Sequence, residues 1–159
     1  MKIRLFITGG TIDGLDIGKK VDKSLVPELL NKLSLKDIIE CEVLMMKDSR
    51  EIDSDDLTLI YEKCSKCEED NIVITHGTMT MVETGKFLLT KNINKTIVLT
   101  GAMISADEKN SDALANLALA LESAGSKPDG VYIAMNDKVF KTDEVKKNVE
   151  KGIFQNISE

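Results

Sequence analysis

Short apolar runs alternate with segments of helical periodicity along most of the 159 residues. Five of these runs end in glycine, threonine or polar residues, and they predict strands over residues 3–7, 41–46, 71–75, 96–100 and 130–135. Between them, apolar residues spaced three and four apart predict helices over residues 27–35, 53–67, 80–90 and 112–123. The second helix opens on Asp53-Ser54-Asp55-Asp56, which is typical of an N-cap.

The order of strand, loop, helix and strand repeats along the chain, and it predicts an α/β fold. We expect right-handed crossovers and a Rossmann-like, doubly wound, mostly parallel sheet with helices on both faces. Ligands of such sheets bind beyond the carboxyl ends of the strands. A site is therefore expected in the loops that follow Ile7, Met46, Thr75, Thr100 and Met135.

Residues 136–159 follow a different pattern. Val139 and Phe140 are separated from Val145 by a polar stretch, which predicts a C-terminal hairpin. Another polar stretch then runs to Glu159. We expect one α/β domain over residues 1–151 and a C-terminal tail over residues 152–159.

Charge and composition exclude some classes of protein. The net charge of -6 excludes a general nucleic-acid binder, which needs a basic face. No apolar stretch is long enough to span a membrane, the N-terminus has no leader pattern, and the three cysteines favour a reducing compartment. We therefore expect a cytoplasmic protein. Cys64 and Cys67 form a single CxxC, which we interpret as two cysteines on adjacent turns of a helix. The sequence contains no nucleotide-binding loop and no cluster of metal ligands, so we expect no cofactor.

Three of the expected loops carry threonine and glycine. Thr8-Gly9-Gly10-Thr11 lets the backbone turn sharply and present N–H groups to a ligand, although a tight strand-to-helix turn has the same composition. Thr75-His76-Gly77-Thr78 precedes a helix whose N-terminus favours an anionic group. We expect the single histidine, His76, to hold this loop by hydrogen bonds rather than to bind a metal. Leu99-Thr100-Gly101-Ala102-Met103 fits either a packed strand end or the wall of a site.

Together these loops resemble the bacterial-type L-asparaginase family, specifically its N-terminal domain. The matching blocks are Thr8-Gly9-Gly10-Thr11-Ile12, Ile74-Thr75-His76-Gly77-Thr78 with Glu83-Thr84, Val98-Leu99-Thr100-Gly101-Ala102-Met103, and Met135-Asn136-Asp137 with Val139. They occur in the family's order and spacing, and the resemblance covers about residues 1–151.

The resemblance implies an enzyme that hydrolyses the side-chain amide of L-asparagine, or of a related small ω-amide, to the acid and ammonia. In the family a threonine hydroxyl attacks the amide carbon, and water then hydrolyses the acyl-enzyme. By position Thr11 resembles the nucleophile. Thr78 and Lys147 resemble the other threonine and the lysine of the family's threonine-lysine-aspartate set. A lysine can act as a base when burial or a nearby cation lowers its pKa.

The resemblance also places a group of residues at the substrate, namely Gly10, Ser49, Arg50, Gly77, Met79 and Ala102. Ser49 resembles the residue that holds the substrate α-carboxylate, and N–H groups of the glycine loops suit an oxyanion. The family's oligomers close this pocket with a C-terminal domain of a neighbouring chain, for which this sequence has no counterpart. We therefore expect a homodimer or homotetramer, or another partner, to close the site.

Three departures from the family's pattern affect the expected activity. Met79 stands where the family has the aspartate that supports the lysine and binds the substrate α-amino group. Arg50 replaces a neutral polar residue; it adds a cation to the pocket if it points inward, and it is a solvated surface residue if it does not. The segment after Thr11 contains no tyrosine. From Met79 and Arg50 we hypothesise a preference for ω-amides that bear a carboxylate but no α-amino group.

Two other functions fit the same residues. One is a catalytically weak or inactive domain that binds an amino acid or a carboxylate, which the missing aspartate, tyrosine and second domain favour. The other is a structural subunit that pairs with another chain.

Overall fold

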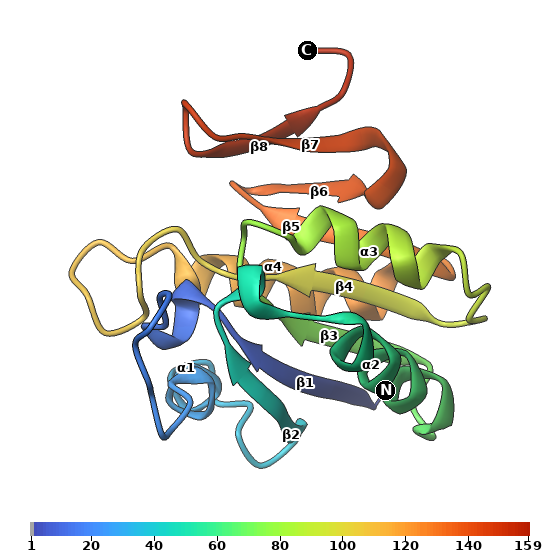
Figure 1. Cartoon of the computed structure of the whole chain (residues 1–159). Coiled ribbons are helices and arrows are strands. Elements are labelled where there is room, and N and C mark those ends of the chain that lie inside the picture. Colours follow the sequence, from blue (N-terminus) through green and yellow to red (C-terminus); the bar gives the residue numbers. More distant parts are fainter. Residues whose placement is uncertain (1) are drawn as a thin grey trace.

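The five apolar runs predicted as strands lie in one sheet. A computed structural model describes residues 2–159, and Figure 1 shows the arrangement. The sheet has six strands in the order β2-β1-β3-β4-β5-β6, and its first five strands are parallel. Their bounds are β1 Ile3–Gly9, β2 Glu40–Lys47, β3 Asn71–Thr75, β4 Thr96–Thr100, β5 Gly130–Met135 and β6 Lys138–Lys141. The predicted doubly wound α/β fold is confirmed.

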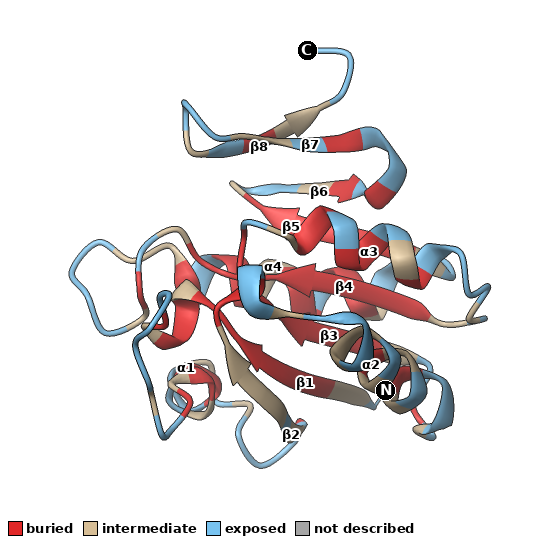
Figure 2. Cartoon of the chain, viewed as in Figure 1, coloured by how far each residue is buried: buried red, intermediate tan, exposed pale blue. Residues whose placement is uncertain are grey.

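Helices cover both faces of this sheet. They are α1 Val26–Lys32, α2 Ser54–Lys66, α3 Met81–Leu89 and α4 Ala113–Ser126. One hydrophobic cluster contains residues of α1 and α4, and a second contains residues of α2 and α3. The strands contribute to both clusters in alternation: Val73 of β3 belongs to the first, whereas Ile72 and Ile74 belong to the second. All three are fully buried, and the central strands are mostly red in Figure 2, with β4 buried along its whole length.

The predicted start of α2 is also confirmed. Asp53 is its N-cap and accepts a hydrogen bond from the Asp56 backbone N–H, while the Asp56 side chain accepts one from the Asp53 backbone N–H. This reciprocal capping satisfies two N–H groups that would otherwise lack partners at the helix end. It fixes the helix start a few residues beyond the end of β2.

The C-terminal hairpin exists, but its strands differ from those predicted. β6 pairs antiparallel with β5 through a turn at Asn136 and Asp137, both of which have positive φ. The hairpin is formed instead by β7 Val145–Asn148 and β8 Ile153–Asn156. Residues 152–159, expected to be a tail, therefore contain a strand. In Figure 1 the hairpin lies beyond β6, at the end of the molecule where the chain finishes.

The chain does turn over residues 142–144, but the two segments that flank this turn, β6 and β7, pair with other strands and not with each other. Thr142 is fully buried, and its hydroxyl donates a hydrogen bond of 2.8 Å to the backbone oxygen of Val131 in β5. Thr142 thus anchors the stretch to the sheet, while Lys141, Asp143 and Glu144 are exposed. The stretch leads the chain from β6 into β7, which brings Lys147 to the carboxyl ends of the parallel strands.

Candidate active site

A cavity of about 460 Å³ lies at the carboxyl ends of the parallel strands. Its lining comes from the loops that follow β1, β2, β3 and β4, within residues 10–19, 48–50, 77–79 and 105–108. The edge of the sheet is the one that the topology predicted for a ligand. Seven of the expected site residues line this cavity, namely Gly10, Thr11, Ser49, Arg50, Gly77, Thr78 and Met79.

Two glycines allow these loops to approach each other. Gly10 has a φ of +89°, and a Cβ built on it would lie 2.4 Å from the Cα of Gly77. A Cβ on Gly77 would lie 2.7 Å from the Cβ of Ser49. Larger residues at these two positions would overlap their neighbours. The glycines therefore place the loops of Thr11, Thr78 and Ser49 around one space.

Lys147 and Thr78 form the most direct contact between predicted catalytic residues. The Lys147 Nζ lies 2.8 Å from the Thr78 hydroxyl oxygen, and Thr78 is 6% exposed. Burial, and second the positive charge of Arg50, lower the pKa of Lys147. Both effects favour the neutral amine, which is the form that can accept a proton. Lys147 does not itself line the cavity within the described chain, and it reaches the site through Thr78.

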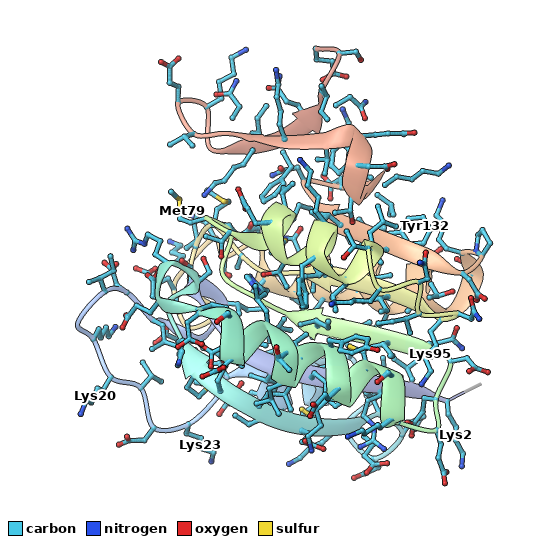
Figure 3. All side chains as sticks on the ribbon, turned by 45° about the vertical axis from the view of Figure 1, so that its right-hand side comes forward. Lys2, Lys20, Lys23, Met79, Lys95 and Tyr132 are labelled. Atoms are coloured by element: carbon cyan, nitrogen blue, oxygen red, sulfur yellow. The ribbon has the colours of Figure 1, made fainter. Side chains whose placement is uncertain are left out.

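Met79 stands on the other side of the same amine. Its sulfur lies 3.2 Å from the Lys147 Nζ, and the side chain is 42% exposed. Figure 3 shows Met79 between the C-terminal hairpin and the loops at the end of the sheet. A thioether is only a weak acceptor and carries no charge, so Lys147 has no carboxylate partner among residues 2–159.

Thr11 is partly exposed and begins a short 3-10 turn, Thr11–Asp13, directly after β1. In the described chain its hydroxyl makes no hydrogen bond, which leaves it free toward the cavity. Ser49 is 3% exposed, and its hydroxyl oxygen accepts from the Thr80 backbone N–H at 3.2 Å. The Thr80 hydroxyl donates to the Ser49 backbone oxygen at 2.9 Å. Ser49 is thus fixed while its own proton remains available to a ligand.

Arg50 lines the cavity, and its guanidinium is already paired with two carboxylates. Its guanidinium donates to both carboxylate oxygens of Asp48, at 2.9 and 2.7 Å, and to Asp16 at 2.8 Å. The hydrogen bonds from Arg50 lower the pKa of Asp48. The free inward-pointing cation considered from the sequence is therefore not present. The ion pairs instead tie the end of β2 to the segment that follows Thr11.

His76 is fully buried, and both ring nitrogens have partners. Nδ1 lies 2.7 Å from the backbone oxygen of Gly77, and Nε2 lies 2.8 Å from the hydroxyl of Thr84. A carbonyl oxygen only accepts, so Nδ1 carries the proton and Nε2 accepts from Thr84. Burial lowers the pKa of His76 to about 4, so the ring is neutral near pH 7. The expected role of His76 in holding its loop fits these contacts.

In the described part of the chain, Ala102 is the one expected substrate residue that does not line the cavity. It is fully buried in the hydrophobic cluster of α1 and α4. Sequence reasoning also missed charged lining residues, namely Asp16, Lys19, Asp107 and Glu108. These residues are exposed on loops, without periodicity or a motif, so nothing in the local sequence indicates that the fold brings them to one cavity.

The remaining candidates for chemistry lie outside the cavity. Cys64 is fully buried on α2, and burial raises the pKa of its thiol to about 12, which makes it unreactive. It packs inward from the helix, in the hydrophobic cluster of α2 and α3. Over residues 2–159, no three histidine, cysteine or acidic side chains come together as metal ligands. None of the helices in that range is long and apolar enough to cross a bilayer.

Fold and site together define a doubly wound α/β protein with a cavity lined by threonine-bearing glycine loops, beside which a lysine contacts one of the threonines. The sequence profile of the family described as "Asparaginase, N-terminal" matches residues 2–154. The chain therefore belongs to the asparaginase family, through its N-terminal domain.

Individual relatives agree with this assignment. An L-asparaginase of Thermococcus kodakarensis is 31% identical over 99% of this chain and 52% of its own length, and its structure superimposes with a TM-score of 0.86. A probable periplasmic L-asparaginase of Haemophilus influenzae is 35% identical over 91% of this chain and 46% of its own. A probable cytoplasmic L-asparaginase of Campylobacter jejuni has a TM-score of 0.83 at 29% identity, covering 98% of this chain and 52% of that one. The chain spans about half the length of the curated relatives it matches.

Proposed function

We propose that this chain hydrolyses a small ω-amide of the asparagine type to the acid and ammonia, with Thr11 as the nucleophile. The observation that carries the proposal is the contact of 2.8 Å between Lys147 and Thr78 beside the cavity that Thr11 lines. A threonine hydroxyl is a weak nucleophile until a base accepts its proton. A lysine whose pKa is lowered can accept that proton through the Thr78 hydroxyl.

The proposed reaction has two steps. The Thr11 oxygen bonds to the amide carbon, the carbon–nitrogen bond breaks, and the proton held at Lys147 leaves with the nitrogen as ammonia. Water then attacks the carbonyl carbon of the resulting ester. The water oxygen and one of its protons become part of the released acid, and the other proton returns to the Thr11 oxygen. We propose that backbone N–H groups of the glycine loops stabilise the oxyanion of both steps.

Ammonia release from L-asparagine and from succinamate tests this function. Thr11→Ala should abolish the release, whereas Thr58→Ala, on the exposed side of α2, should keep it. Mass spectrometry of the quenched enzyme should show an acyl adduct on the peptide that contains Thr11. Ammonia release that survives in Thr11→Ala would disprove the proposed nucleophile.

A second candidate function is supported by Met79. Because the amine of Lys147 faces a sulfur instead of a carboxylate, catalysis can be weak and the cavity can act as a binding site for an amino acid or carboxylate. In that case a ligand such as L-asparagine would bind, as measured by calorimetry, and remain intact after long incubation. Hydrolysis of the bound amide would exclude this alternative.

We also propose that a homodimer or homotetramer, or another partner, covers the cavity. Light scattering during size-exclusion chromatography measures the assembly directly. A cytoplasmic location remains a prediction from the sequence, since one relative is named periplasmic and another cytoplasmic.

A further inference from the structure

Lys19 is the second cation on the wall of the cavity. It belongs to residues 14–24, the segment between the turn after Thr11 and α1. A Cβ built on Gly14 would lie 3.8 Å from the Lys19 Nζ and 3.3 Å from the hydroxyl oxygen of Ser105. The ammonium group therefore stands over the backbone that immediately follows the Thr11 turn, near the loop after β4.

The position of this segment is fixed at its base. Asp13 is 1% exposed, and its Oδ1 accepts hydrogen bonds from the Ser24 hydroxyl at 2.7 Å and from the Leu25 backbone N–H at 2.8 Å. One buried carboxyl thus holds both ends of the segment together. Farther along the segment, the ion pair of Asp16 with Arg50 holds it against the end of β2. These contacts keep Lys19 at the cavity instead of leaving it on a free loop.

The two cations of the cavity differ in what they already bind. Arg50 is engaged by both Asp48 and Asp16. Lys19 makes no salt bridge within residues 2–159. Of the remaining acidic residues on the wall, Asp107 accepts a hydrogen bond from Ser105 at 2.6 Å, and Glu108 is exposed.

An incoming anion interacts differently with these two groups. A guanidinium that already binds two carboxylates gains little from a third. The third carboxylate would also be repelled by the negative charges of Asp16 and Asp48. An unpaired ammonium gains a charge-assisted hydrogen bond from the same anion. We propose that Lys19, rather than Arg50, receives a carboxylate of the ligand and determines specificity for carboxylate-bearing ω-amides. This assignment rests on the proposed function and names the substrate class of the same site.

The test compares two neighbouring lysines. Lys19→Met removes the cation at the cavity, and Lys20→Met removes an equal charge from an exposed residue that does not line it. Figure 3 shows Lys20 directed away from the body of the protein. For succinamate we expect Lys19→Met to lower kcat/KM roughly tenfold, mainly through KM. For the uncharged methyl ester of succinamate it should change little, and Lys20→Met should leave both substrates unaffected.

Succinate binding separates this assignment from the proposed hydrolysis. By calorimetry, we expect Lys19→Met to weaken succinate binding roughly tenfold and Lys20→Met to leave it unchanged. If no amide is hydrolysed but this difference is found, the proposed function fails and the assignment of Lys19 stands. Equal binding by the two variants, no succinate binding by the unmodified protein, or a loss seen in Arg50→Gln in place of Lys19→Met overturns the assignment.

Discussion

The Lys147 Nζ lies 2.8 Å from the hydroxyl oxygen of Thr78, although the two residues are 69 positions apart in the chain. Lys147 is on β7 of the C-terminal hairpin, and Thr78 is in the loop after β3. The buried anchor at Thr142 directs the chain into β7 and so brings the lysine to this loop. The hairpin therefore contributes to the candidate site, because it supplies the only amine that touches a predicted catalytic hydroxyl in residues 2–159.

Removing the amine of Lys147 should abolish hydrolysis, whereas removing the amine of the neighbouring Lys146 should not. We expect Lys147→Met to reduce ammonia release by at least about a hundredfold, because a positioned base contributes roughly that much. Lys146→Met is the matched control, since Lys146 is exposed and its amine contacts the backbone oxygen of Glu159. Similar rates for the two variants would exclude Lys147 as the base.

An acidic residue at position 79 should change both the lysine and the choice of substrate. In Met79→Asp a carboxylate replaces the sulfur that lies 3.2 Å from Lys147, and its negative charge should raise the pKa of the lysine. We expect the pH profile of kcat to shift to higher pH. The ratio of kcat/KM for asparagine over succinamate should rise roughly tenfold, because the carboxylate can bind the α-amino group.

Met79→Leu serves as the comparison, because it changes the side chain without adding charge. Its substrate ratio should match that of the unmodified protein. An unchanged ratio in Met79→Asp would show that the side chain at position 79 does not contact the α-amino group of the substrate. The expected preference for succinamate would then have lost its basis.

The central strands were predictable because they are buried on both faces. The predicted ranges 71–75, 96–100 and 130–135 coincide with β3, β4 and β5. Continuous apolar runs of this kind end where the chain leaves the core, so the local sequence indicates where each strand begins and ends. The edge of the sheet was harder to predict, because the pairing of β6 with β5 depends on positive φ at Asn136 and Asp137.

The candidate site was predictable only where a motif marks it. The glycine loops carry Thr11 and Thr78, and the resemblance pointed to Ser49 and Lys147. By contrast, the positions of Asp16 and Lys19 depend on contacts of a loop with distant residues, which no local pattern encodes. The burial of Ala102 was equally hard to predict, because a small residue after a strand can face either a cavity or the core.

The close approach of the glycine loops gives a prediction about stability. Gly10→Ala combines the strain of a side chain at a φ of +89° with a Cβ that would lie 2.4 Å from Gly77. We expect a loss of about 3 kcal/mol or more in the free energy of unfolding. Gly18→Ala is the control, because its φ is +77° but nothing lies within 4 Å of the added Cβ. There the cost should be about 1 kcal/mol, and urea unfolding of both variants measures the difference.

The buried histidine gives a prediction about acid stability. Its pKa is lowered from 6.5 to about 4 in the folded chain, so below pH 6.5 the unfolded chain binds a proton that the folded chain does not. Stability from this group is therefore fully present above pH 6.5 and is lost as the pH falls toward 4, by about 3 kcal/mol in total.

In His76→Asn this pH-dependent contribution disappears, since asparagine does not titrate. Urea unfolding between pH 4 and 7 should then show a shallower decline for the variant than for the unmodified protein. Because the chain contains one histidine, every other titrating group is common to the two proteins and cancels in the difference. Two parallel curves, offset by a constant, would show that His76 titrates normally and that its ring is not held neutral by burial.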